Sequence, residues 1–220
     1  MNEHHDKIVI KFEDNDTSTT SNPIQVSTAA PETTGFVIDT QAPAKIDELT
    51  EDLSIPFGHQ NAMLDDVMPD FDFANPATDP VKLAHKLINI VRVKKALGIS
   101  ANQLGLPYRV FVMQSDPVFV CFNPVVTYYS DDGAVLDEAC LSWPGVGVKI
   151  KRPVSIRVRF KDPYGNACTK QFTGMAARVF QHEFDHLNGI RYYDRAVPFH
   201  KERFKKNWKK VVRFIKNRAK

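Results

Sequence analysis

The sequence carries two histidines and a glutamate at helical spacing in the stretch Gln181-His182-Glu183-Phe184-Asp185-His186-Leu187. On a helix, residues four positions apart are neighbours, with Cβ atoms about 5–6 Å apart, so the His182 and His186 rings can bind one metal ion. Glu183 lies roughly 100° around the helix from His182, where its carboxylate can take a proton from water. The pattern indicates a metal-dependent hydrolase. The alternative is a surface helix that happens to carry two histidines and a glutamate.

A catalytic metal site of this kind takes three protein ligands and leaves one position open, so a third ligand is needed. The extended metzincin pattern would require a histidine at position 192, where this chain has Tyr192. A thermolysin-like site would use a later glutamate, and the only one downstream is Glu202, in a basic segment that favours a salt bridge. Upstream lies Glu138-Ala139-Cys140-Leu141-Ser142, so Cys140 is the candidate third ligand.

Two further motifs stand with this cysteine segment in a definite order. Gly98-Ile99-Ser100-Ala101-Asn102-Gln103 precedes it, and Gln181-His182-Glu183-Phe184-Asp185-His186-Leu187-Asn188-Gly189 follows it and continues into Tyr193-Asp194-Arg195. Together the three motifs resemble those of the peptide deformylase family. The resemblance implies removal of formyl from the N-terminal methionine of newly made polypeptides. A related metal-dependent amidohydrolase or peptidase is the nearest alternative.

The resemblance also implies a metal and catalytic groups. Cys140, His182 and His186 would hold one divalent ion; the family favours Fe(II), and a thiolate with two neutral imidazoles also suits Zn, Ni or Co. In the expected mechanism, metal-bound water attacks the formyl carbon while Glu183 acts first as general base and then as general acid. The side chain of Gln103 and the backbone N–H of Leu141 are expected to stabilise the oxyanion.

Substrate contacts are expected from two segments. Gly98 and Ile99 would let an extended peptide approach closely, because a strand-like substrate needs edge hydrogen bonds without intruding side chains. By the same resemblance, Met175 and Val179 would line the pocket for the substrate's methionine side chain, with core packing of the helix as the alternative. Arg178 could contact the substrate backbone or pair with an acidic residue on the surface, and the second is expected.

Four residues depart from the usual motifs of the resembled family, namely Ala96, Ser100, Asn102 and Ala139. None of them removes a chemical group that the mechanism requires. They bear on loop geometry and substrate preference more than on activity.

Composition agrees with a soluble enzyme. The chain has 220 residues, 43% of them hydrophobic, and an odd number of cysteines, three, which argues against a disulfide framework and for a reducing compartment. Cys121 lies in an apolar run and is expected to be a buried small side chain. No long apolar span or signal sequence is apparent, so we expect a cytoplasmic monomer that makes no membrane contact.

The pattern along the chain predicts three parts: a flexible polar extension at 1–45, a catalytic domain at 46–198 and a basic amphipathic helix at 199–220. Within the domain, a helix is expected at 79–97 and the metal-binding helix at about 175–187. Strands are expected at 110–113, 118–122, 125–129, 146–150 and 155–160. The predicted fold is α+β, with antiparallel sheets packed around the central metal-binding helix, as in peptide deformylases.

Charge is concentrated at the C-terminus. From Arg195 onward there are eleven Lys or Arg residues and one acidic residue, a net charge of +10, while the whole chain carries +3. An apolar stripe, formed by Phe204, Trp208, Val211, Val212 and Ile215, is expected to dock on the core. The basic side chains then face outward and could contact the ribosome through its RNA, or simply be solvated. They are Lys205, Lys206, Lys209, Lys210, Arg213 and Lys216.

Overall fold

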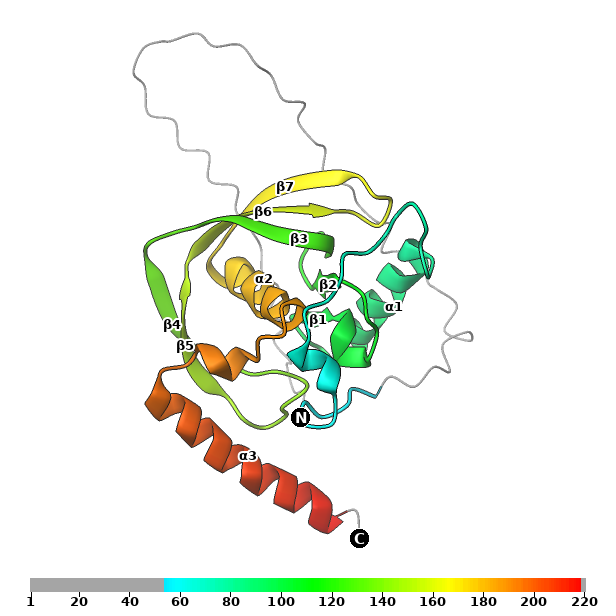
Figure 1. Ribbon diagram of the computed structural model, residues 1–220. Coiled ribbons are helices and arrows are strands. Elements are labelled where there is room, and N and C mark those ends of the chain that lie inside the picture. Colours follow the sequence, from blue (N-terminus) through cyan, green and yellow to red (C-terminus); the bar gives the residue numbers. More distant parts are fainter. Residues whose placement is uncertain (1–53, 219–220) are drawn as a thin grey trace, which may run out of the picture.

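The computed structural model describes residues 54–218 (Figure 1). Its helices are α1 (Pro80–Val93), α2 (Gly174–Leu187) and α3 (Pro198–Arg218). Its strands are β1 (Gly98–Ser100), β2 (Val110–Met113), β3 (Phe119–Tyr129), β4 (Gly133–Glu138), β5 (Val148–Pro153), β6 (Ser155–Lys161) and β7 (Ala167–Thr173). Short 3₁₀ helices are η2 (Ala62–Asp65), η3 (Ala101–Leu104) and η4 (Tyr192–Arg195). The extension expected at 1–45, and the expected start of the catalytic domain at residue 46, lie outside the described residues.

Antiparallel pairing joins five strands into one sheet in the order β1-β2-β3-β6-β7, and β4 and β5 form a separate two-stranded sheet. Helix α2 lies between these strands, with β3, β6 and β7 along one side of it and β4 and β5 along another (Figure 1). This arrangement confirms the predicted α+β fold, in which antiparallel sheets surround a central helix.

Helix α2 is buried on almost every side, since ten of its 14 residues are buried. Phe180 packs against Phe111 and Phe172, with ring centroids 4.9 and 5.6 Å away. Each fully buried phenylalanine contributes roughly 1.5–3 kcal/mol of transfer free energy. His182 lies about 200° around the helix from Phe180, so the apolar face anchors α2 and directs the polar face elsewhere.

Helix α1 begins as the sequence predicts, with Asp79 capping its first turn and a proline at its first position. It ends at Val93 rather than near residue 97. The physical reason is Lys95, which adopts a left-handed backbone conformation with φ of 52° and so cannot continue the helix.

The strands differ from the prediction in three respects. The strand expected at 146–150 begins and ends later, as β5 (Val148–Pro153). The segments expected as separate strands at 118–122 and 125–129 form one strand, β3, with an irregular register around Asn123, whose φ is 48°. Strands β4 and β7 are not apparent from the sequence, because most of their residues are exposed and do not alternate between buried and exposed. Pairing with β5 and β6 determines their conformation.

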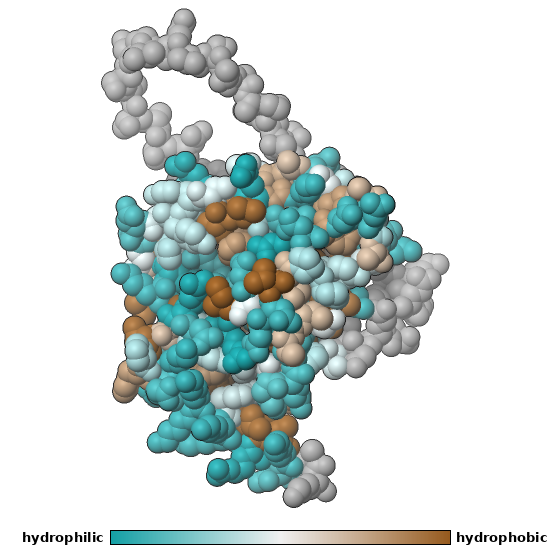
Figure 2. Space-filling view, viewed as in Figure 1, coloured by the Kyte–Doolittle hydropathy of each residue, from teal (hydrophilic) through white to brown (hydrophobic). Residues whose placement is uncertain are grey.

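Helix α3 docks through the first half of its apolar stripe. Phe204 is buried with Tyr192 and Tyr193, and Trp208 and Val211 are partly buried against the same cluster. The outward face of α3 is mainly hydrophilic in the space-filling view (Figure 2). Among residues 54–218, none of the helices combines the length and apolar character needed to span a bilayer.

Candidate metal centre

Three buried side chains converge at one point beside α2. His182 and His186 come from α2, and Cys140 comes from the loop that follows β4. One potential ligand atom from each residue lies within 4.8 Å of the others, and Sγ of Cys140 is 3.2 Å from Nε2 of His186. One thiolate and two imidazoles in this arrangement fit a single divalent transition-metal ion and leave a coordination position for water or substrate.

The loop around Cys140 is fixed by its neighbours. The N–H of Trp143 donates to the carbonyl of Cys140 at 3.0 Å, and the N–H of Gly58 donates to the carbonyl of Ser142 at 2.7 Å. The Trp143 ring is stacked parallel to the His186 ring, with centroids 6.2 Å apart. These contacts hold the cysteine against α2 although 42 residues separate Cys140 from His182 in sequence.

Glu138 orients the first histidine. Its Oε2 lies 3.0 Å from Nδ1 of His182, and its carboxylate accepts two hydrogen bonds from Arg152, at 2.6 and 3.0 Å. Burial alone would raise the pKa of Glu138, but the hydrogen bonds from His182 and Arg152 outweigh it and lower the pKa to about 2. Glu138 is therefore ionised, and Nε2 of His182 remains for a metal ion.

Arg178 corrects one expectation from the sequence. It does not pair on the surface: the side chain is buried, and its guanidinium donates to Oε1 of Glu138 and to the backbone carbonyl of Ala134, both at 2.6 Å. The expectation was wrong because the helix is enclosed on nearly all sides, so an arginine there reaches a buried carboxylate.

Sequence reasoning did not assign roles to Glu138, Arg152 or Asp185. Arg152 also donates to Asp185 at 2.8 Å, so the two carboxylates and the guanidinium form a continuous ionic network. Glu138 and Asp185 lie within the motifs quoted above, and this position could have indicated that they have a role at the centre. Arg152 carries no such signal, because it is one of several basic residues in β5.

Glu183 lies beside the three ligand atoms in an enclosed position. Its side chain is 4% exposed, and Oε2 has no hydrogen-bond partner within the described part of the chain. Burial raises the pKa of Glu183 to about 7, against a lowering effect of His182. A carboxylate with a pKa near neutrality can both accept and return a proton.

The two histidines differ in their electrostatic surroundings. Burial and the neighbouring His182 hold the pKa of His186 well below its usual range, so this ring is neutral. Burial also opposes charge on His182, but the hydrogen bonds that its ring donates to Cys140 and Glu138 raise its pKa to about 10. A metal ion at this place would compete with that proton, because histidine binds metal only as the neutral ring.

Gln103 is held in a defined orientation near the sulfur atom. Its Oε1 accepts from the N–H and hydroxyl of Ser100 at 3.0 and 3.1 Å. Its Nε2 is 3.4 Å from Sγ of Cys140 and donates to Oγ of Ser142 at 3.1 Å. Leu141, which directly follows the cysteine, is half-buried. The amide donor of Gln103 is thus preorganised at the edge of the centre.

Strand β1 is an edge strand of the five-stranded sheet within residues 54–218. Gly98 lies in this strand, and a Cβ added to it would be only 2.6 Å from Oε1 of Glu183. The side chain of Ile99 is fully buried in the core. An extended peptide could therefore reach this edge through backbone contacts alone.

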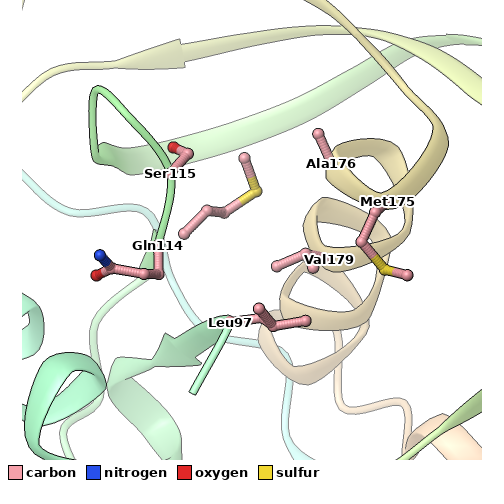
Figure 3. A pocket seen from close by; sticks show the side chains of 7 residues that line it. Leu97, Gln114, Ser115, Met175, Ala176 and Val179 are labelled. Atoms are coloured by element: carbon pink, nitrogen blue, oxygen red, sulfur yellow. The ribbon is translucent and has the colours of Figure 1, made fainter. Parts of the chain in front are cut away.

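A pocket lies between the N-terminal half of α2 and the ends of β1 and β2 (Figure 3). Both expected residues, Met175 and Val179, line it, and Leu97 reaches toward Val179 from the opposite wall (Figure 3). The sequence did not single out the other lining residues, which come from the end of β2 and the turn after it, from the residue before β1 and from the first turn of α2. They are Leu97, Met113, Gln114, Ser115 and Ala176.

Comparison with known sequences gives consistent matches. A sequence model of the family described as Polypeptide deformylase matches residues 58–202. A protein of Thermotoga maritima named peptide deformylase is 35% identical over 137 residues, covering 61% of this chain and 83% of that protein.

Solved structures agree with this result. The crystal structure of peptide deformylase from Thermotoga maritima has a TM-score of 0.60 and 31% identity, and the match covers 66% of this chain and 97% of that one. The peptide deformylase of Plasmodium falciparum has a TM-score of 0.65 and 26% identity, with coverage of 74% and 98%.

Proposed function

The chain belongs to the polypeptide deformylase family, so it is an enzyme that removes the N-formyl group from new polypeptides, and we propose that the centre formed by Cys140, His182 and His186 performs this reaction with one metal ion. The convergence of the three buried donor atoms within 4.8 Å carries the proposal. We propose Fe(II) as the working ion, and Zn, Ni or Co would suit the same donors.

When bound, the ion supplies a Lewis acid that activates water and polarises the formyl carbonyl. The protein's own part is to hold and move the proton. Glu183 accepts a proton from the attacking water and delivers it to the leaving amine. The pKa of about 7, caused by burial, supports both directions of transfer near neutral pH.

Negative charge develops on the formyl oxygen during attack, and two donors are proposed for it. Nε2 of Gln103 is one, and the backbone N–H of Leu141 is the other. The bonds from Ser100 that hold Oε1 of Gln103 support this role, because they leave the amide donor aimed at the centre without reorganisation. Removal of one comparable donor costs about 2.7–4 kcal/mol in other enzymes.

The substrate is proposed to lie along β1. Gly98 and Ile99 lie in this edge strand, and the absent side chain of Gly98 leaves space beside Glu183. The methionine side chain is proposed to enter the pocket lined by Met175 and Val179. Both residues precede the histidines on the same helix, which brings the pocket close to the proposed reaction site.

The decisive experiment measures formate release from formyl-Met-Ala-Ser by the metal-loaded protein under anaerobic conditions. Glu183→Gln keeps the side-chain size but removes the proton acceptor, so kcat should fall by at least about 10²-fold. Glu202→Gln is the control, since Glu202 is exposed and pairs only with Lys205 among described contacts. Full activity of the Glu183 variant would rule out the proposed proton transfer.

We also propose that α3 contacts ribosomal RNA and that the enzyme works as a cytoplasmic monomer. Six of the exposed basic residues of α3 are proposed to make this contact, while Phe204 attaches the helix to the core. This arrangement supports an electrostatic contact that leaves the apolar stripe in place. The six are Lys205, Lys206, Lys209, Lys210, Arg213 and Lys216.

Charge substitution tests the ribosome contact without disturbing the core. A variant with Lys209, Lys210, Arg213 and Lys216 changed to Gln should co-sediment less with ribosomes at low salt and show a weaker salt dependence. The matched control changes four exposed basic residues on or beside α1, namely Lys82, Arg92, Lys94 and Lys95. Equal co-sedimentation of both variants would contradict the proposed contact.

A further inference from the structure

The two histidines of the metal centre are supported in different ways. His182 has a partner for its second ring nitrogen, since Nδ1 lies 3.0 Å from Oε2 of Glu138. Nδ1 of His186 is buried and has no hydrogen-bond partner among residues 54–218. A hydrogen bond to the second nitrogen is the usual way in which a protein orients a histidine ligand. The position of His186 must therefore be set by other contacts.

One contact is with the ring of His186 and another is with its backbone. Trp143 stacks on the imidazole with an interplanar angle of 5°, which restricts the tilt of the ring. The backbone carbonyl of His186 accepts a hydrogen bond of 2.7 Å from Nδ2 of Asn102. The Asn102 side chain is fully buried, so water does not compete for this bond.

The carbonyl of His186 needs such a donor because it lies in the last turn of α2. The last four carbonyls of a helix have no N–H partner within the helix. The N–H of Gly189 also approaches this carbonyl, but at 3.3 Å. The bond from Asn102 is shorter than the one from Gly189, and it ties this carbonyl to a segment outside α2.

Asn102 is itself fixed by a second buried amide. Nδ2 of Asn61 donates to the carbonyl of Asn102 at 2.8 Å and approaches the carbonyl of Gln103 at 3.3 Å. Oδ1 of Asn61 accepts from the N–H of Met63 in η2 at 3.2 Å. The amide pair thus joins η2, η3 and the end of α2 into one rigid unit.

We propose that Asn102 is a positioning residue that holds Nε2 of His186 against Cys140 and couples this ligand to the turn that carries Gln103. The inference rests on the proposed metal site and adds a specific support for one of its ligands. A shift of the His186 backbone would move the ring and its Nε2, because Nδ1 makes no hydrogen bond within residues 54–218 that would hold the ring in place. Metal affinity and ligand geometry should both depend on Asn102.

The test uses Co(II) as the probe in the full-length protein under anaerobic conditions. Affinity is measured by competition with a chromophoric chelator, and ligand geometry by the thiolate-to-Co(II) absorption band. Asn102→Ala removes the donor, and Asn102→Asp keeps the side-chain size but places an oxygen against the carbonyl. Each folded variant should bind Co(II) at least about tenfold more weakly, with a shifted band.

Asn188→Ala is a matched control. Nδ2 of Asn188 donates to the carbonyl of Phe184 at 2.7 Å, so it makes the same kind of bond at the same end of α2. Among described contacts it does not reach η3. Its loss should lower thermal stability to a similar extent while leaving Co(II) affinity and the absorption band unchanged.

The outcomes distinguish the positioning role of Asn102 from the metal site itself. If the unaltered protein binds Co(II) with a thiolate band and the Asn102 and Asn188 variants behave alike, the positioning role is overturned and the metal site stands. If the unaltered protein shows no thiolate band, the proposed metal site and the positioning role both fall. A selective loss at Asn102 supports the role.

Discussion

At the scale of single residues, the carboxylate of Glu138 serves three buried partners. It accepts hydrogen bonds from Arg152 and Arg178, each with a shortest distance of 2.6 Å, and it lies 3.0 Å from the His182 ring. Two arginines beside one carboxylate would be costly to bury without Asp185, which takes the other side of Arg152. The same carboxylate therefore balances buried charge and orients a candidate ligand.

Substitution of Glu138 by Gln should affect metal affinity and stability together. The amide cannot accept from Arg152, Arg178 and His182 at once, so metal affinity should fall by about 10–100-fold. Loss of one partner in a buried ionic network should lower the free energy of unfolding by about 3–5 kcal/mol. Chelator competition and urea unfolding measure the two effects.

The neighbouring residue provides the control for this substitution. Asp137→Asn removes a carboxylate that is 68% exposed and pairs with Lys149, so its effect should be below about 1 kcal/mol. The pKa of Glu138 adds a pH test: because it is lowered from 4.5 to about 2, the stabilisation is present above pH 4.5 and is lost as the pH falls toward 2. Equal stability of the two variants near neutral pH would contradict the network.

At the scale of elements, the packing of β1 against α2 determines the shape of the reaction site. Gly98 of β1 faces Glu183 of α2 so closely that no other side chain fits without displacing the carboxylate. The backbone of Gly98 is not in the left-handed region, because its φ is not positive. Its requirement for glycine is therefore one of space and not of backbone conformation.

Gly98→Ala should lower deformylase activity through displacement of Glu183. The added Cβ would be 2.6 Å from Oε1, so the carboxylate must move, and a misplacement of about 1 Å can cost on the order of 10²-fold in rate. We expect at least a tenfold loss of kcat/KM in the formate assay, with little loss of thermal stability.

Gly133→Ala is a suitable comparison at the start of β4. Its added Cβ would come within 3.0 Å only of the Lys151 side chain, at 2.9 Å, and that side chain is flexible and can move. This variant should retain activity. A Gly98 variant that is as active as the Gly133 variant would show that the close approach has no catalytic consequence.

At the scale of the whole molecule, α3 is connected to the metal centre through aromatic side chains. Phe204 stacks on Tyr193 with centroids 4.2 Å apart and meets Tyr192 at 5.6 Å. Tyr192 in turn lies 5.3 Å from the His182 ring and donates to the carbonyl of Val146 at 2.7 Å. The C-terminal helix is therefore part of the packing that supports the centre, in addition to carrying charge.

Phe204→Ala should strongly destabilise the protein. Phe204 is 2% exposed, and truncation of a buried phenylalanine costs about 3–5 kcal/mol through lost burial and the cavity that remains. Urea unfolding should reveal this loss. Phe214→Ala, on the same helix but 58% exposed, should change the free energy of unfolding by less than about 0.5 kcal/mol. Similar values for both variants would mean that α3 does not contribute to the core.

Much of the fold could be predicted from local patterns. The apolar periodicity and the Asp79-Pro80 cap located α1, and the two histidines at helical spacing located α2. The predicted end of α1 was wrong, because the left-handed conformation of Lys95 has no clear signal in the local sequence. Strands β4 and β7 could not be predicted, since their exposed residues carry no periodic pattern and partner strands determine their conformation.

The sequence by itself determined the chemistry that is available to this protein. The i, i+4 spacing of His182 and His186 and the position of Glu183 between them follow from helix geometry, and the motif around Cys140 supplies the third donor. These are local properties, so they can be recognised in the sequence alone. The family assignment follows from the same motifs.

Only the tertiary structure decided how those groups are supported. It placed Arg178 inside the protein, joined Glu138 to His182 and Arg152, and brought Asn102 to the carbonyl of His186. Each of these contacts joins residues that are well separated in sequence, and each forms because burial excludes water and leaves polar groups to pair with one another. No local pattern specifies such pairs, since their partners are chosen by the packing of the sheets around α2.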